Sequence, residues 1–293
     1  MPIIAIPNVS TGSDTESIRG LADAVRGAGA ILLDTHSDAT HDRSVFTITG
    51  PDDRLVEAAV ALANRARILD LTVQRGVHPR MGVLDVCPFV PHGETTMDDA
   101  VFAARSAGEQ IAALTGIPVY LYGEAALRTP APTLPELRRG GLEALRAKAK
   151  RGLGPDFGGD ANDRLGVVCV GARGVLIAFN VWIRGDIERA SDIARRVRES
   201  GNGLAGVRSL GFEIAPPDIC QVSMNLTAPE VTGIEAAFEA VVSHADALGV
   251  TVAATEIVGL PPQRFMPPAN ARATRLLREP GRSLEVALRE AGF

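Results

Sequence analysis

The sequence predicts an α+β protein made of two tandem subdomains of the split βαβ, or ferredoxin-like, type. First, the apolar residues of 174–259 predict strand, helix, strand, strand, helix and strand in that order. Second, residues 3–90 predict the same six elements in the same order. Third, residues 152–163 form a Gly- and Asp-rich stretch without apolar periodicity. This stretch places a domain boundary between residues 1–163 and residues 164–293.

Each element of the first half is predicted from its apolar spacing. In 14–28, for example, Ile18, Leu21 and Val25 recur at helical spacing. The same reasoning predicts strands at 3–7, 30–34, 44–49, 83–90 and 119–122, and helices at 14–28, 52–70, 97–114 and within 133–151. The basic residues of 138–151 are interpreted as a solvated helix face, which could still attract an anionic ligand.

The second half predicts four strands and two helices, followed by a tail. The strands are expected at 174–183, 204–214, 218–226 and 250–259, and the helices at 185–199 and 232–247. Residues 170–174 are interpreted as a hairpin turn between two strands, and the tail at 263–293 as peripheral. A sheet with helices on one face leaves its other face open. We therefore expect the two sheets to face each other across a ligand cleft.

The composition excludes several classes of function. The chain has 293 residues, 46% of them hydrophobic and 22% charged, with a formal net charge of −5. This charge argues against nucleic acid or a membrane surface as a partner. Three well-separated cysteines in apolar runs indicate buried, reduced thiols. With neither a signal-like N-terminus nor a long apolar run, the sequence predicts a cytoplasmic protein.

Residues 75–89 are the strongest candidate for an active site. His78 precedes Pro79, which keeps it out of helical geometry, and the predicted strand that follows gives the loop a rigid base. An imidazole at its reference pKa can both take up and release a proton near neutral pH. The alternative is an ordinary surface turn with a solvated histidine.

Residues 34–44 form a second polar segment, expected as a loop between two strands. One interpretation is a turn held by its own side-chain hydrogen bonds. Another is a metal site formed by Asp34, His36, Asp38 and His41, although their spacing matches no closed-site template. In the third, this loop faces His78, and one carboxylate or imidazole orients the other. No nucleophile elbow, P-loop or dinucleotide-binding glycine motif occurs in a suitable context.

A series of short motifs resembles those of the glutamate formiminotransferase family. They follow the family order from about residue 3 to residue 262. The matching segments are 7–10, 32–45 with Gly50, 78–82, 85–89, 118–125, 154–158, 170–173, 178–181, 221–226 and 256–260.

The resemblance implies an activity and its partners. In that family, two α/β subdomains enclose a groove for tetrahydrofolate, and a formimino group moves between N-formimino-glutamate and N5 of tetrahydrofolate. It therefore implies tetrahydrofolate as co-substrate, an amino acid such as glutamate as the other partner, no metal, and a homodimer. Some relatives carry a fused cyclodeaminase domain, which this chain is too short to contain.

The resemblance also assigns site residues. It places the family's catalytic histidine at His78 and its folate contacts in the loop 154–162. We predict proton transfer by His78 with help from His36 and Asp34, and binding of substrate carboxylates by arginines. The predicted substrate- and folate-binding residues are Asn8, Ser10, Arg43, Arg75, Arg80, Gly82, Asp85, Asp156, Phe157, Gly158, Gly159, Asn180 and Asn225.

Four positions depart from the family pattern. His36 and Thr11 replace acidic residues, Val77 replaces the usual Glu before the catalytic histidine, and Trp182 replaces an Asn. We therefore expect the fold and folate site to be retained, while the amine partner or the transferred group differs. The alternatives are a folate-binding relative without turnover and a metal-dependent hydrolase using Asp34, His36 and His41.

Overall fold

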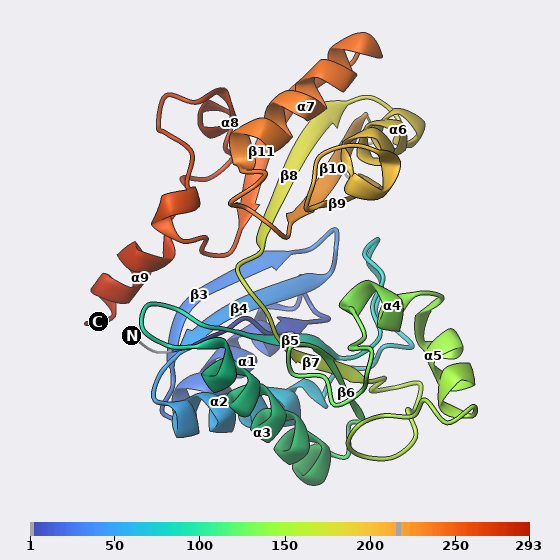
Figure 1. The fold of residues 1–293 in the computed structure, drawn as a ribbon, viewed down its shortest axis with the longest axis vertical. Helices are drawn as coiled ribbons and strands as arrows, with labels where there is room; N and C mark the ends of the chain where they lie inside the picture. Colours follow the sequence, from blue (N-terminus) through green and yellow to red (C-terminus); the bar gives the residue numbers. More distant parts are fainter. Residues whose placement is uncertain (1–2, 215–217) are drawn as a thin grey trace. The chain divides into compact units, whose positions relative to one another are not determined.

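The computed structural model describes residues 3–214 and 218–293, and the chain forms two compact units, Met1–Gly174 and Val175–Phe293 (Figure 1). The predicted division after residue 163 therefore falls inside the first unit. The reason is β7 (Val168–Ala172), which pairs in parallel with both β5 (Leu84–Val90) and β6 (Val119–Gly123) and so belongs to the first sheet. The prediction of a hairpin turn at 170–174 was also wrong, because residues 168–172 belong to this strand.

The first sheet joins an antiparallel part to a parallel part. Its strands lie in the order β3-β4-(β1, β2)-β5-β7-β6, where β1 and β2 share the place between β4 and β5. The first four places of this order have the strand arrangement of a split βαβ unit. The strands are β1 (Ile4–Ala5), β2 (Asn8–Val9), β3 (Ile31–Asp38), β4 (Arg43–Thr49), β5 (Leu84–Val90) and β6 (Val119–Gly123).

Helices cover the two faces of this sheet unequally. One face packs its buried side chains, such as Phe46 and Phe89, against α1 (Thr15–Gly27), α2 (Asp52–Ala66) and α3 (Met97–Thr115). The other face is covered over β6 and β7 by Leu137 of α4 (Leu134–Arg138) and Leu145 of α5 (Gly141–Ala149). Figure 1 shows α4 and α5 apart from the three longer helices.

The second unit is a complete split βαβ domain. Its four strands are antiparallel in the order β11-β8-β10-β9, and one face of the sheet is buried by α6 and α7. The prediction of an α+β protein with two tandem subdomains is therefore confirmed. The elements are β8 (Ile177–Arg184), α6 (Ile187–Val197), a 3₁₀ helix (Glu199–Gly201), β9 (Val207–Glu213), β10 (Ile219–Leu226), α7 (Ile234–Ala247) and β11 (Thr251–Val258).

The tail is more than the peripheral segment that the sequence suggested. It contains a 3₁₀ helix (Gln263–Phe265), α8 (Arg272–Arg275) and α9 (Leu284–Glu290). Ala273 of α8 is 1% exposed and belongs to the core of the second unit. Thr255 of β11 also forms a bridge with Leu277. The apolar residues of this segment show little helical periodicity, so the sequence did not predict these contacts.

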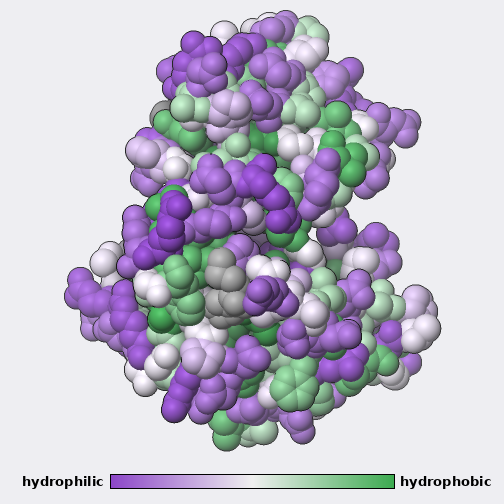
Figure 2. All heavy atoms as spheres, turned by 60° about the vertical axis from the view of Figure 1, so that its left-hand side comes forward, coloured by the Kyte–Doolittle hydropathy of each residue, from purple (hydrophilic) through white to green (hydrophobic). Residues whose placement is uncertain are grey.

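Residues 34–44 are mostly strand rather than loop, contrary to expectation. β3 extends to Asp38 and β4 begins at Arg43, so the connection is a short turn in which Asp42 has a φ of 47°. Among the residues described, no helix combines the length and apolar character needed to cross a membrane. Figure 2 shows polar and apolar side chains interspersed over the visible face. The predicted cleft between facing sheets stays a prediction.

Candidate active site

Asp85 owes its orientation to a β-bulge. Asn8 pairs with Val86, but the next residue, Val9, pairs with Leu84, so Asp85 is the extra residue on β5. Such bulges redirect a side chain and are common beside active sites. The side chain of Asp85 is 1% exposed. Its Oδ1 accepts a hydrogen bond of 2.7 Å from the backbone N–H of Met81.

Two arginines share the other oxygen of this carboxylate. Asp85 Oδ2 lies 2.5 Å from Nη2 of Arg43 and 2.9 Å from Nη2 of Arg138. Burial alone would raise the pKa of Asp85, but Arg43 and then Arg138 hold it below its ordinary value. The carboxylate is therefore ionised at neutral pH, and the three side chains carry one surplus positive charge. Such a group attracts an anionic ligand.

The carbonyl of Pro79 connects His78 to these arginines. The oxygen accepts hydrogen bonds from Nη2 of Arg138 at 2.5 Å and Nη2 of Arg43 at 3.2 Å, and lies 2.8 Å from Nδ1 of His78. A carbonyl can only accept, so Nδ1 carries the proton of the neutral ring and the lone pair is on Nε2. Burial, followed by the charge of Arg43, lowers the pKa of His78 from its ordinary 6.5. Its ring is therefore neutral at pH 7 and can act as a proton acceptor.

A second ion pair stabilises the loop that contains His78. Arg80 contacts Asp42 at 3.3 Å and donates a 3.1 Å hydrogen bond to the carbonyl of His41. Asp42 also accepts a 2.8 Å hydrogen bond from the N–H of Gly12. The His41 and His78 rings meet edge to face with their centroids 5.9 Å apart. This arrangement balances the charge of Arg80 and ties the loop to the turn between β3 and β4.

The sheet register gathers several predicted site residues on one face. Val45 pairs with both His36 and Asn8, and Thr47 pairs with Asp34. Directly paired residues project from the same side of a sheet. Arg43 is two residues from Val45 and shares that side, so Asp34, His36, Asn8 and Arg43 all lie on the face away from α1–α3.

The family models identify the chain. A model of the formiminotransferase domain, N-terminal subdomain, matches residues 2–173, and a model of the formiminotransferase domain matches residues 178–275. The chain belongs to the formiminotransferase family. It is 38% identical over 269 residues to the glutamate formimidoyltransferase of Streptococcus pyogenes serotype M1, which covers 89% of each chain. It is 37% identical over 267 residues to the glutamate formimidoyltransferase of Thermoplasma acidophilum, covering 89% of this chain and 88% of that one.

Other members of the family are longer. The chain is 39% identical over 271 residues to the formimidoyltransferase-cyclodeaminase of Sus scrofa, covering 89% of this chain and 50% of the relative. It thus spans about half the length of the curated relatives that it matches first.

Two predicted site residues in the formiminotransferase N-terminal subdomain position the loop of His78. The hydroxyl of buried Ser10 donates a 2.8 Å hydrogen bond to the carbonyl of Gly82. A Cβ at Gly82 would overlap the backbone carbonyl of Val167, so this close approach requires glycine. Asn8 donates a 3.0 Å hydrogen bond to the carbonyl of Ile6, whereas Arg75 is exposed.

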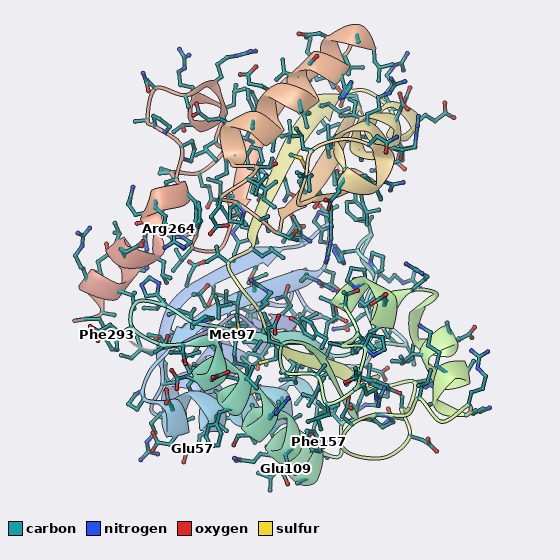
Figure 3. All side chains as sticks on the ribbon, in the orientation of Figure 1. Glu57, Met97, Glu109, Phe157, Arg264 and Phe293 are labelled. Carbon is teal, nitrogen blue, oxygen red and sulfur yellow. The ribbon has the colours of Figure 1, made fainter. Side chains whose placement is uncertain are left out.

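The loop that family resemblance assigns to folate is held by its own residues. Asp156 accepts a 2.7 Å hydrogen bond from the N–H of Leu121 and lies 3.3 Å from Arg128. Phe157 pairs with Val119 and packs beside α3, as Figure 3 shows. Gly158 has a φ of 85°, and Gly159 is exposed.

A cavity of about 260 Å³ adjoins this formiminotransferase loop, under α5. Its lining includes apolar Leu145 and Val167 together with the charged or polar side chains of Tyr120, Arg146, Lys150 and Asp160.

The remaining two predicted residues lie in the second formiminotransferase subdomain. Asn180 of β8 donates a 2.8 Å hydrogen bond to Glu256 of β11. Asn225 of β10 is exposed and pairs with Ala178. The register places Asn180 on the same sheet face as Trp182, opposite α6 and α7. The structure therefore divides the predicted site residues of this family member between two units.

Sequence reasoning missed Arg138. It was interpreted as part of a solvated basic face, yet its side chain is only 17% exposed and contacts Asp85. Its partner lies far back in the chain, so no local spacing could reveal the contact. The structure does not bring together the residues of the metal interpretation, Asp34, His36, Asp38 and His41. Across the described residues, no three His, Cys, Asp or Glu side chains gather where they could hold an ion. Asp38 instead accepts a hydrogen bond from the N–H of His41 at 2.7 Å.

Proposed function

We propose that this chain is a folate-dependent one-carbon transferase that moves a formimino group between glutamate and N5 of tetrahydrofolate. The relatives named glutamate formimidoyltransferase, matched over most of their length, support this activity. One observation supports the chemistry most directly: a neutral His78, with its lone pair on Nε2, lies beside two arginines that share one carboxylate.

In the proposed reaction, His78 moves one proton between two nitrogens. The amine nitrogen attacks the formimino carbon, a new C–N bond forms, and the adduct carries a proton on the attacking nitrogen. Nε2 of His78 accepts this proton. It then returns the proton to the other nitrogen as the original C–N bond breaks. Asp34 and His36 are proposed to orient the groups on the same sheet face.

Substrate binding is proposed to adjust the basicity of His78. Arg43 and Arg138 both oppose protonation of the ring in the free protein. A substrate carboxylate placed at these guanidiniums would offset their charge and raise the pKa of His78 toward neutral. The ring would then accept a proton efficiently only when the substrate is bound.

Folate contacts are proposed along the loop Asp156, Phe157, Gly158 and Gly159, with the adjoining cavity of about 260 Å³ taking up part of the folate. Asn8, Arg75, Arg80, Asn180 and Asn225 are proposed as further substrate contacts. We also propose a homodimer in the cytoplasm. The three free, buried cysteines fit a reducing compartment.

The test is formimino transfer by the purified protein, with 5-formimino-tetrahydrofolate and glutamate as substrates. We expect transfer by the wild type and a loss of roughly 10²- to 10⁴-fold in kcat for His78→Asn. Full activity of His78→Asn would overturn the role of His78. Tight folate binding without any transfer would instead indicate a non-catalytic relative.

A different amine is the second candidate partner. Trp182 replaces the usual family Asn, and the Arg278 guanidinium lies over its ring, 3.8 Å from the centroid. This stacked pair gives the face of the second sheet a bulkier surface than an Asn would. Assays with a panel of amines, and with the 5-formyl as well as the 5-formimino donor, separate the two candidates. Transfer to another amine but not to glutamate would reject glutamate as the partner.

A further inference from the structure

We infer that Arg173 binds a carboxylate of one of the two substrates, at a site separate from the Arg43–Arg138 pair. Arg173 follows β7 directly, and its N–H donates a 3.1 Å hydrogen bond to the carbonyl of Phe89. It therefore lies where the parallel strands β5, β7 and β6 end. In open α/β sheets, ligands bind at the carboxyl ends of such strands.

The charge of Arg173 has no anionic partner in the described part of the chain. Nη1 donates a 2.8 Å hydrogen bond to the carbonyl of Gly174, and the guanidinium lies near the side chain of Tyr122. Burial lowers the pKa of Arg173. By contrast, Arg43 and Arg80 each contact a carboxylate. A guanidinium that is partly removed from water without an anion is unfavourable unless a ligand supplies one.

Tyr122 lies beside this guanidinium but supplies no anion. Tyr122 is 4% exposed, and burial raises its pKa, so the phenol is neutral. A Cβ at Gly171 would overlap the Tyr122 ring, so the ring lies flat on β7 only because residue 171 is glycine. The arrangement leaves the guanidinium oriented before any ligand binds.

Arg173 shares a sheet face with the His78 site. Gly171 of β7 pairs with Tyr122, and Arg173 lies two residues beyond Gly171, so both project to the side that carries Tyr122. On this side of the sheet, Cys169 of β7 pairs with Val86 of β5, and Val86 pairs with Asn8 of β2. Asn8 lies on the same face as Arg43 and His36. Along β5, the four residue steps from Asp85 to Phe89 span roughly 13 Å. An extended substrate could therefore reach both sites.

The inference rests on the proposed function, and two ligand pairs identify which substrate supplies the carboxylate. Folic acid and pteroic acid differ by the glutamate moiety, and glutamate and 4-aminobutyrate differ by the α-carboxylate. Affinities would be measured by calorimetry for the wild type, Arg173→Gln and Arg173→Lys. The matched control is Arg19→Gln, which alters an exposed arginine of α1. KM and kcat would be measured where transfer occurs.

We expect Arg173→Gln to lower the affinity for one ligand by roughly 10- to 100-fold. If that ligand is folic acid, the affinity for pteroic acid should change little. If it is glutamate, the affinity for 4-aminobutyrate should change little. Arg173→Lys should recover part of the loss, because the charge remains and the planar fork is lost. Equal affinities for Arg173→Gln and Arg19→Gln, or an equal loss for all four ligands, would overturn the inference. So would a wild type that binds neither folic acid nor glutamate. A wild type that binds but transfers nothing would refute only the proposed function.

Discussion

At the scale of single residues, Asp85 has the most consequential environment in the first unit. We predict that Asp85→Asn lowers the free energy of unfolding by about 3–5 kcal/mol, because Arg43 and Arg138 lose their shared anion. Urea denaturation measures this change. The control is Asp23→Asn, whose 3.2 Å pair with Arg26 is exposed and should contribute less than about 1 kcal/mol. Equal effects of the two substitutions would contradict the prediction.

The contribution of Asp85 should disappear in acid. Its pKa in the folded protein is below the unfolded value of about 3.9, so the folded state favours the ionised form. The stabilisation is then complete above pH ~4 and is lost as the pH falls through the folded pKa. We expect the stability difference between wild type and Asp85→Asn to be constant from pH 5 to pH 7 and to narrow below about pH 4. A constant difference down to the lowest measurable pH would count against this.

His78 should give different pH profiles in the free and the substrate-bound protein. Its pKa in the free protein is lowered by burial and by Arg43, so the acidic limb of kcat/KM should lie well below pH 6.5. A bound carboxylate offsets the arginine charge, so the acidic limb of kcat should lie at a higher pH. Steady-state kinetics from pH 5 to pH 9 should therefore show the acidic limb in kcat, whereas kcat/KM should show no acidic limb in this range. If the acidic limbs of kcat and kcat/KM lay at the same pH, the charge of the substrate would not affect the pKa of His78.

At the scale of elements, the loop of residues 75–82 depends on its close contact with Val167, directly before β7. Gly82→Ala should lower the free energy of unfolding by about 1–3 kcal/mol, because the added methyl overlaps the backbone carbonyl of Val167. Gly27→Ala is the control, since nothing lies within 4 Å of a Cβ there and the position is helical. It should raise stability by about 0.5–1 kcal/mol. A Gly82→Ala variant as stable as the wild type would disprove the required contact.

Most elements could be predicted from local pattern, and the exceptions share a physical cause. α1 and α2 have long amphipathic periods, and both were expected close to their observed bounds. β7 is short, flanked by polar loops and stabilised by strands distant in sequence, so its pairing was missed. β3 was expected to end at Asp34 because polar residues follow. The strand nevertheless continues to Asp38, since its pairing with β4 supplies the backbone hydrogen bonds.

The candidate site was predictable to a similar degree. Arg43, His78 and Asp85 were named from the sequence, and their contacts bring them together. Arg138 and Arg173 were not assigned to any site, because their roles follow from a carboxylate and a tyrosine distant along the chain. The bulge at Asp85 could not be anticipated either, since it depends on the register against β2.

At the scale of the whole molecule, the three cysteines are buried in two separate units, so their reactivity measures the stability of each unit. Burial raises the pKa of Cys87 and of Cys169 to about 12 in the first unit, and it also raises the pKa of Cys220 in the second. Thiolates are the reactive form, so none should react with a disulfide reagent at pH 8 in the native protein, and all three should react in guanidinium. In variants that keep only one of the three cysteines, the rate of labelling then measures how readily the unit around that cysteine unfolds. Rapid labelling of native Cys87 or Cys169 would contradict the burial described.

The place of β7 in the first sheet has a consequence for biosynthesis. It is the last strand of its unit to leave the ribosome, yet it lies between β5 and β6, which emerge earlier. Until residue 172 is available, β5 and β6 each have an unpaired edge, and other nascent chains could pair with these edges. The interval between translation of β6 and β7 is therefore when this polypeptide most needs a chaperone.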